Sequence, residues 1–228
     1  MNLLTNFSGT ILTGGASRRM GRDKAFIEVP VRSAPEPDRE DERRPLVLVA
    51  ATALQGAGAH DVVCIGGDQS GLAALGLAWR ADDHPGAGPL GGLITALRSA
   101  ALPIVVVLTC DLPEIDAGSV RGLVGVLDRT PEAQAAMPVL DGRLQILTAA
   151  YRRSVLPSLD AAFAAGERSV RRALEGVEIA IVDHLDPRVL ADVDSPGDLD
   201  RYARGSTPWP PTPTTVAEGL TDRPGSQA

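Results

Sequence analysis

Short apolar runs rich in β-branched residues alternate along the chain with longer segments in which Ala and Leu recur at helical spacing. The short runs predict strands and the longer segments predict helices. The expected strands are residues 10–13, 62–65, 104–109 and 179–182, and the expected helices are 46–57, 90–100, 119–129 and 154–165. Strands that alternate with helices form right-handed crossovers. The pattern therefore predicts an α/β fold with a mostly parallel sheet.

Two segments lack this alternation. Residues 32–44 combine prolines with dense mixed charge and almost no apolar side chains, so burial cannot offset the entropy of ordering them. From residue 205 onward the chain is rich in Pro, Thr and Gly, with PWPPTP at 208–213. We predict one domain over residues 1–204 with a disordered surface insertion at about 32–44. A disordered tail, either inert or carrying a proline-rich partner motif, follows over 205–228.

Charge and cysteine content narrow the function classes. The chain has 29 acidic and 22 basic residues, for a net charge of -7, which argues against a general electrostatic grip on nucleic acid or an anionic membrane. No apolar run approaches the roughly 20 residues that cross a bilayer. Cys64 and Cys110 each lie in an apolar run, so we expect no disulfide framework and a reducing, cytoplasmic location.

A glycine-rich loop with basic residues follows the first predicted strand. Its sequence, at residues 12–25, is LTGGASRRMGRDKA. Gly14 and Gly15 can aim backbone amides at an anion without a Cβ in the way, and Arg18, Arg19 and Lys24 add positive charge. We therefore predict a phosphate-binding loop. Its spacing fits neither a P-loop nor the dinucleotide-binding glycine pattern, which disfavours both of those classes.

Two later segments bring a helix start and a carboxylate to the same sheet edge. ADDHPGAGPLGGL, at 81–93, has a glycine-rich turn before a helix whose free amides would face a cleft. CDLP, at 110–113, follows the most apolar strand and places Asp111 where Mg²⁺ commonly takes one or two carboxylates. Asp111 is our principal candidate metal ligand, with a helix N-cap or a turn former as the alternative. Cys110 is expected to be a packed side chain rather than a nucleophile.

These motifs resemble the molybdenum cofactor guanylyltransferase family, whose first loop is commonly L-x-G-G-x-S-x-R-M-G-x-D-K and whose central strand ends in C-D-x-P. The resemblance covers residues 9–203 apart from the insertion. It implies a single Rossmann-like, three-layer αβα nucleotidyltransferase domain with Mg²⁺ as cofactor. The implied catalytic residues are Lys24, Arg19 and Asp111; the implied nucleotide-binding residues are Leu12, Gly14, Gly15, Ala16, Lys24, Asp83, Gly88 and Asp111; the implied metal ligands are Asp111 and Asp194.

Some of these assignments keep an alternative. Asp82 competes with Asp83 for the nucleoside, and Asp194 is equally compatible with a helix N-cap before Pro196. Arg168, Ser169 and Arg171 resemble a family helix and are candidates to contact the acceptor's phosphate. A solvent-exposed basic helix face is the other reading of this segment.

The reaction that the resemblance implies is transfer of GMP from GTP to the terminal phosphate of a molybdopterin-type acceptor, with release of pyrophosphate. The implied partners are GTP, that acceptor, and molybdoenzymes or their chaperones. One alternative is a related enzyme that uses CTP or another phosphorylated acceptor. Another is a non-catalytic nucleotide-binding adaptor. Base choice is left open, because Gly66, Gly67 and Asp68 stand where family members often carry an asparagine.

Overall fold

The computed structural model describes residues 5–14, 23–31 and 42–205. The predictions of a disordered insertion and tail concern segments that lie mostly outside this part of the chain. At the end of the predicted insertion, however, Arg43 and Arg44 belong to a strand, β3 (Arg43–Pro45). This strand pairs antiparallel with β2 (Glu28–Pro30).

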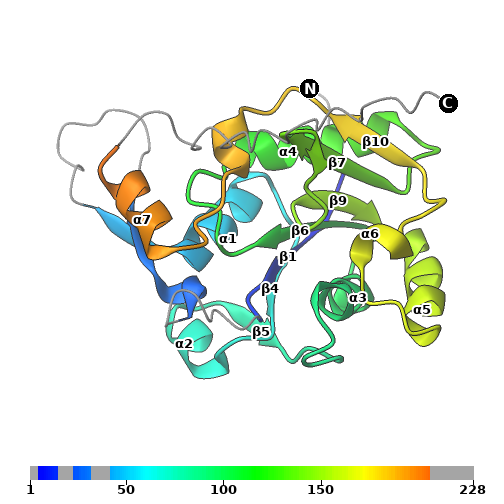
Figure 1. Cartoon of the computed structure of the whole chain (residues 1–228), viewed down its shortest axis with the longest axis horizontal. Coiled ribbons are helices and arrows are strands. Elements are labelled where there is room, and N and C mark those ends of the chain that lie inside the picture. Colours follow the sequence, from blue (N-terminus) through cyan, green and yellow to red (C-terminus); the bar gives the residue numbers. More distant parts are fainter. Residues whose placement is uncertain (1–4, 15–22, 32–41, 206–228) are drawn as a thin grey trace, which may run out of the picture.

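Eight strands of the described chain form one mixed sheet in the order β10-β7-β9-β6-β1-β4-β5, with β8 paired to β7 (Figure 1). Their bounds are β1 Ser8–Leu12, β4 Val62–Ile65, β5 Ala78–Arg80, β6 Ile104–Thr109, β7 Ala135–Leu140, β8 Arg143–Leu144, β9 Ala149–Arg152 and β10 Ile179–Val182. The pairs β1 with β4, β1 with β6, β4 with β5 and β7 with β10 are parallel. Strand β9 runs antiparallel to both of its neighbours, and β8 runs antiparallel to β7.

Helices cover both faces of the sheet. On one face lie α1 (Leu46–Gly56) and α4 (Ala117–Arg129), and on the other lie α3 (Pro89–Ser99), α5 (Leu156–Ala164) and α6 (Val170–Ala173) (Figure 1). Alternate residues of β6 divide between the two cores: Val106 and Leu108 pack toward α1 and α4, and Val105 and Val107 pack toward α3 and α5. The predicted α/β class, mostly parallel sheet and three layers are confirmed.

The segment after β10 returns across the sheet to the carboxyl end of β6. It contains a short 3-10 helix (Pro187–Leu190) and then α7 (Pro196–Ala203), whose buried Tyr202 packs in a small core with β2. The Tyr202 hydroxyl donates to the carbonyl of Pro30 at 3.2 Å, and the Val193 amide donates to the carbonyl of Asp111 at 2.9 Å. These bonds hold residues 192–194 beside the loop that follows β6.

The remaining described α-helix, α2 (Gln69–Ala74), connects β4 to β5, and two further 3-10 helices span Lys24–Phe26 and Arg153–Val155. Asp68 forms its N-cap, accepting hydrogen bonds from the amides of Ser70 and Gly71. Asp68 therefore serves the fold rather than replacing the asparagine side chain that the resemblance led us to expect near the nucleoside.

Candidate active site

A cleft of about 750 Å³ opens at the carboxyl ends of β1, β4 and β6. This is the edge at which ligands bind in open α/β sheets. The lining includes Leu12, Thr13, Gly14, Asp23, Lys24, Ile65, Gly66, Gly67, Asp82, Gly86, Gly88, Gly92, Thr109, Cys110, Asp111 and Leu147. The structure thus brings five predicted site residues together here, namely Leu12, Gly14, Lys24, Gly88 and Asp111. Gly15, Ala16 and Arg19 lie outside the described residues.

One wall of the cleft consists of two loops in close backbone contact. The amides of Thr13 and Gly14 both donate to the carbonyl of Ile65 at 3.0 Å, and the Thr13 hydroxyl donates to the carbonyl of Gly66 at 2.8 Å. Gly66 and Gly67 have φ values of +71° and +73°, and a Cβ on Gly67 would lie 3.0 Å from the Thr13 carbonyl oxygen. Only glycine fits both the backbone conformation and this contact.

The amide of Gly14 therefore has a different role from the one we predicted. Because it donates to Ile65 within the fold, it does not point freely at a phosphate. Gly14 contributes its Cα surface to the cleft instead, and an anion would have to find its backbone donors elsewhere. The start of α3 also borders the cleft through Gly88 and Pro89, but Pro89 has no amide hydrogen and the amides of Gly91 and Gly92 donate to the Gly88 carbonyl.

Lys24 lies between two carboxylates. Its Nζ is 3.3 Å from Asp111 Oδ2, and it also donates to Asp194 Oδ1. Burial by itself would lower the pKa of Lys24, but its hydrogen bond to Asp194 and the charges of Asp111 and Asp194 raise that pKa above its usual value. The short 3-10 helix that carries it, Lys24–Phe26, is capped by Asp23, which accepts from the amide of Ala25. Lys24 is therefore a firmly charged group at the edge of the cleft.

A third carboxylate completes the cluster. Ligand oxygens of Asp111, Asp192 and Asp194 lie within 4.8 Å of one another. The pKa of Asp192 is raised to about 6 although the residue is exposed. The main cause is partial loss of hydration at its carboxyl group, and the negative charges of Asp194 and Asp111 add to it. Asp111 Oδ1 is buried and has no hydrogen-bond partner among the described residues. Three converging carboxylates with an unpaired oxygen fit a hard divalent cation such as Mg²⁺.

Asp192 is a site residue that the sequence reasoning missed. The signal was present in L-A-D-V-D, because residues two apart in an extended segment face the same side. The structure also distinguishes between the two predicted roles of Asp194, a metal ligand and a helix N-cap. The N-cap of α7 is Ser195, which forms a capping box with Asp198, so Asp194 is free to face Lys24.

The two aspartates before α3 point in different directions. Asp82 lines the cleft, where its Oδ1 accepts hydrogen bonds from the Thr95 hydroxyl at 2.9 Å and from the His84 amide at 3.0 Å. Asp83 is exposed and pairs with Arg80 and Arg98 instead. Of the two candidates for a nucleoside contact, the structure therefore places Asp82 rather than Asp83 in the cleft, with one carboxylate oxygen left for a ligand.

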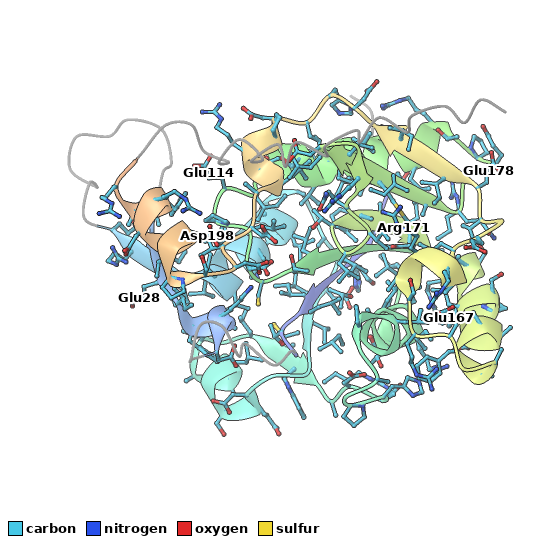
Figure 2. All side chains as sticks on the ribbon, viewed as in Figure 1. Glu28, Glu114, Glu167, Arg171, Glu178 and Asp198 are labelled. Atoms are coloured by element: carbon cyan, nitrogen blue, oxygen red, sulfur yellow. The ribbon has the colours of Figure 1, made fainter. Side chains whose placement is uncertain are left out.

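The basic segment around α6 has structural partners. Arg168 lies over the Phe163 ring, 4.0 Å from its centroid, and donates to the backbone carbonyls of Phe163 and Glu167. Ser169 is the N-cap of α6. Figure 2 shows Arg171 and Glu167 at the opposite end of the molecule from Asp198 of α7. Arg168, Ser169 and Arg171 are not among the residues that line the cleft, and their predicted contact with an acceptor remains a prediction.

Both cysteines are buried and free, as expected. Burial raises the pKa of the Cys64 thiol to about 12. Burial, followed by the charge of Asp111, also raises the pKa of Cys110 well above its usual range. A thiol held neutral is a poor nucleophile, so Cys110 contributes packing at the end of β6.

Comparison with known proteins extends this description. Residues 9–183 match the model of the family described as the MobA-like NTP transferase domain. The chain belongs to this family. A probable molybdenum cofactor guanylyltransferase from Chloroflexus aggregans is 32% identical over 203 residues, which cover 84% of this chain and 91% of the relative. The molybdenum cofactor guanylyltransferase of Pseudomonas putida is 32% identical over 195 residues, covering 82% and 92%. This MobA-like chain is therefore a nucleotidyltransferase.

Solved structures agree on the fold. The molybdopterin-guanine dinucleotide biosynthesis protein A from Archaeoglobus fulgidus superposes with a TM-score of 0.66 at 21% identity, covering 86% of this chain and 97% of that one. A 2-C-methyl-D-erythritol 4-phosphate cytidylyltransferase from Thermus thermophilus superposes with a TM-score of 0.59 at 18% identity, covering 86% and 96%. Among the residues described for this MobA-like chain, none of the helices has both the length and the apolar character to span a bilayer.

Proposed function

We propose that this MobA-like nucleotidyltransferase moves GMP from GTP to the terminal phosphate of a molybdopterin-type acceptor and uses Mg²⁺ as its cofactor. The single observation that carries the proposal is the cluster of Lys24, Asp111, Asp192 and Asp194 at the mouth of a glycine-walled cleft. Relatives named as molybdenum cofactor guanylyltransferases, 32% identical over most of the chain, support the choice of reaction.

In this proposal Asp111, Asp192 and Asp194 hold the Mg²⁺ ion, which offsets negative charge on the triphosphate when it is bound. Lys24 supplies a second positive charge beside the phosphates. The close backbone contact between Thr13 and Gly67 fixes a rigid wall against which the nucleoside lies. Asp82 offers an oxygen to a ribose hydroxyl or a base amino group. Such residues act by positioning and by neutralising charge, because transfer at phosphorus requires little covalent chemistry from a side chain.

A direct test is to incubate the protein with Mg²⁺, molybdopterin and GTP, CTP or ATP in turn. We expect pyrophosphate release with GTP and a product whose mass equals that of molybdopterin plus a GMP residue. Preference for CTP would overturn the base assignment. The fold neighbour from Thermus thermophilus is a cytidylyltransferase, which makes this a necessary comparison.

The adaptor alternative makes a different prediction. A non-catalytic nucleotide-binding protein would bind a triphosphate but release no pyrophosphate with any acceptor. The firm charge on Lys24 and its position beside Asp111 favour an enzyme, because binding alone does not require a cation and a carboxylate to converge beside the phosphates. Pyrophosphate release that depends on both GTP and molybdopterin would exclude the adaptor.

A further inference from the structure

Lys24 is unusual among the basic residues of this chain. Of the 22 basic residues, 21 are arginines and Lys24 is the one lysine. Its ammonium group is largely buried and contacts two of the three carboxylates, Asp111 and Asp194. Two of the three carboxylates that suit a divalent cation therefore receive hydrogen bonds from Lys24, while Oδ1 of Asp111 has no hydrogen-bond partner among the described residues.

Two cations at the same carboxylates oppose each other's binding. An ammonium group beside Asp111 Oδ2 and Asp194 Oδ1 would lie in close contact with a metal ion bound to the same carboxylates, where the two positive charges repel strongly. A divalent ion that takes one ligand oxygen from each of Asp111 and Asp194 would also compete with Lys24 for the negative charge of these two carboxylates. Binding of one cation thus opposes binding of the other.

We propose that Lys24 and the divalent cation bind the carboxylate cluster alternately, so that metal binding displaces the ammonium group. The flexible four-carbon side chain can then swing from the carboxylates toward the cleft, which Lys24 also lines. This inference rests on the proposed function only for the identity of the anion that the released Lys24 meets, a triphosphate. The exchange itself requires just the cluster and a divalent ion.

Lysine suits this exchange better than arginine. A guanidinium group forms two parallel hydrogen bonds with a carboxylate and holds it in a fixed geometry. An ammonium group is a compact charge whose donors rotate, so it can leave one partner and take another. In this chain the other 21 basic residues are arginines, and the lysine stands at residue 24, beside the carboxylates.

The single lysine provides a direct spectroscopic test. Protein labelled with ¹³C-lysine should give one Lys Cε signal, and its loss in Lys24→Arg would confirm the assignment. Titration with Mg²⁺, in the absence of any nucleotide, should shift this signal with the same midpoint as Mg²⁺ binding measured by calorimetry. A signal that stays unchanged while Mg²⁺ binding saturates would overturn the proposal.

Metal affinity provides a second, independent test. Free Mn²⁺ can be followed by its electron paramagnetic resonance signal during titration of the wild type, Lys24→Met and Lys24→Arg. If the carboxylates are free of Lys24 about a tenth of the time, Lys24→Met should bind Mn²⁺ about tenfold more tightly than the wild type. Lys24→Arg keeps a competing cation and should bind no more tightly than the wild type. Equal or weaker Mn²⁺ binding by Lys24→Met would refute the exchange.

Asp111→Asn ties the titration to this cluster, because it should weaken Mn²⁺ binding at least tenfold; undiminished binding would place the ion elsewhere and overturn the proposal. The result of these titrations can be distinguished from the result of the test of guanylyl transfer. Neither titration contains GTP or an acceptor, so a failed exchange would leave guanylyl transfer standing. Transfer of a different nucleotide would likewise leave the exchange standing.

Discussion

Replacing Asp111 with asparagine is expected to lower turnover by about two to three orders of magnitude without unfolding the protein. The substitution keeps the shape of the side chain but removes the charge that faces Lys24 and the proposed metal ion. The loop itself should stay in place, because the Asp111 carbonyl accepts from the Val193 amide whatever the side chain. The effect should therefore fall on chemistry rather than on stability.

The magnitude follows from the geometry. Asp111 Oδ2 lies 3.3 Å from Lys24 Nζ, and both side chains are 17% exposed. A unit charge pair at that separation interacts by about 5 kcal/mol at an effective dielectric constant near 20, before desolvation and solvent screening are subtracted. After these subtractions we expect the activation free energy to rise by about 3–4 kcal/mol. Removal of one preorganised electrostatic group costs other enzymes a similar amount. Each 1.36 kcal/mol is about a factor of ten in rate.

Asp116 offers a matched control in the same loop. It caps α4 by accepting from the amide and hydroxyl of Ser119, and it does not line the cleft. Asparagine caps helices as well as aspartate does, so Asp116→Asn should leave both turnover and melting temperature nearly unchanged. Pyrophosphate release at saturating substrate is the assay. Turnover of Asp111→Asn within tenfold of the wild type would refute the reasoning.

Three further outcomes follow from the same structure. Asp82→Asn should raise the KM for the nucleotide several-fold in steady-state assays, whereas Asp83→Asn should leave it unchanged, because the Asp83 carboxylate pairs with arginines outside the cleft. Gly67→Ala should destabilise the protein by about 1–2 kcal/mol in a denaturant titration, since its φ is +73° and the new methyl would lie 3.0 Å from the Thr13 carbonyl oxygen. The hydrogen bond from the Ser169 amide is the largest of the effects that lower the pKa of Glu167 to about 2. The ionised Glu167 therefore stabilises the fold above the ordinary pKa of 4.5, and this stabilisation is lost as pH falls from 4.5 to about 2. Thermal unfolding of Glu167→Gln should accordingly depend less on pH across that interval.

Much of the sheet could be predicted from the sequence. The apolar runs at 62–65, 104–109 and 179–182 match β4, β6 and β10, and the run is longest in β6, which is buried on both faces. The apolar runs did not predict strands β7 and β9, because alanines supply much of their buried surface and alanine gives little strand signal. Strand β9 lies between β6 and β7 and is antiparallel to both. Its position depends on tertiary packing, which the local sequence pattern does not predict.

The site was predicted where its side chains lie in recognisable sequence motifs. Asp111 and Lys24 were found because each lies in a motif at the carboxyl edge of the sheet. The choice between Asp82 and Asp83 depended instead on the hydroxyl of Thr95, the seventh residue of α3, which donates to Asp82 and holds it toward the cleft. The packing of Gly66 and Gly67 against Thr13 likewise involves residues more than 50 positions apart and gives no signal in either segment.

The pairing of Lys24 with Asp194 has a consequence for how the protein is made. These residues are 170 positions apart, and residues 192–194 are held in place by the hydrogen bonds of Val193 and Tyr202 and by the burial of Val193. During translation β1, β4 and β6 leave the ribosome first and can pair while the last carboxylates are still unsynthesised. A nascent chain would thus hold a nearly finished sheet with an incomplete cation site, and catalytic competence would arrive with the final helix.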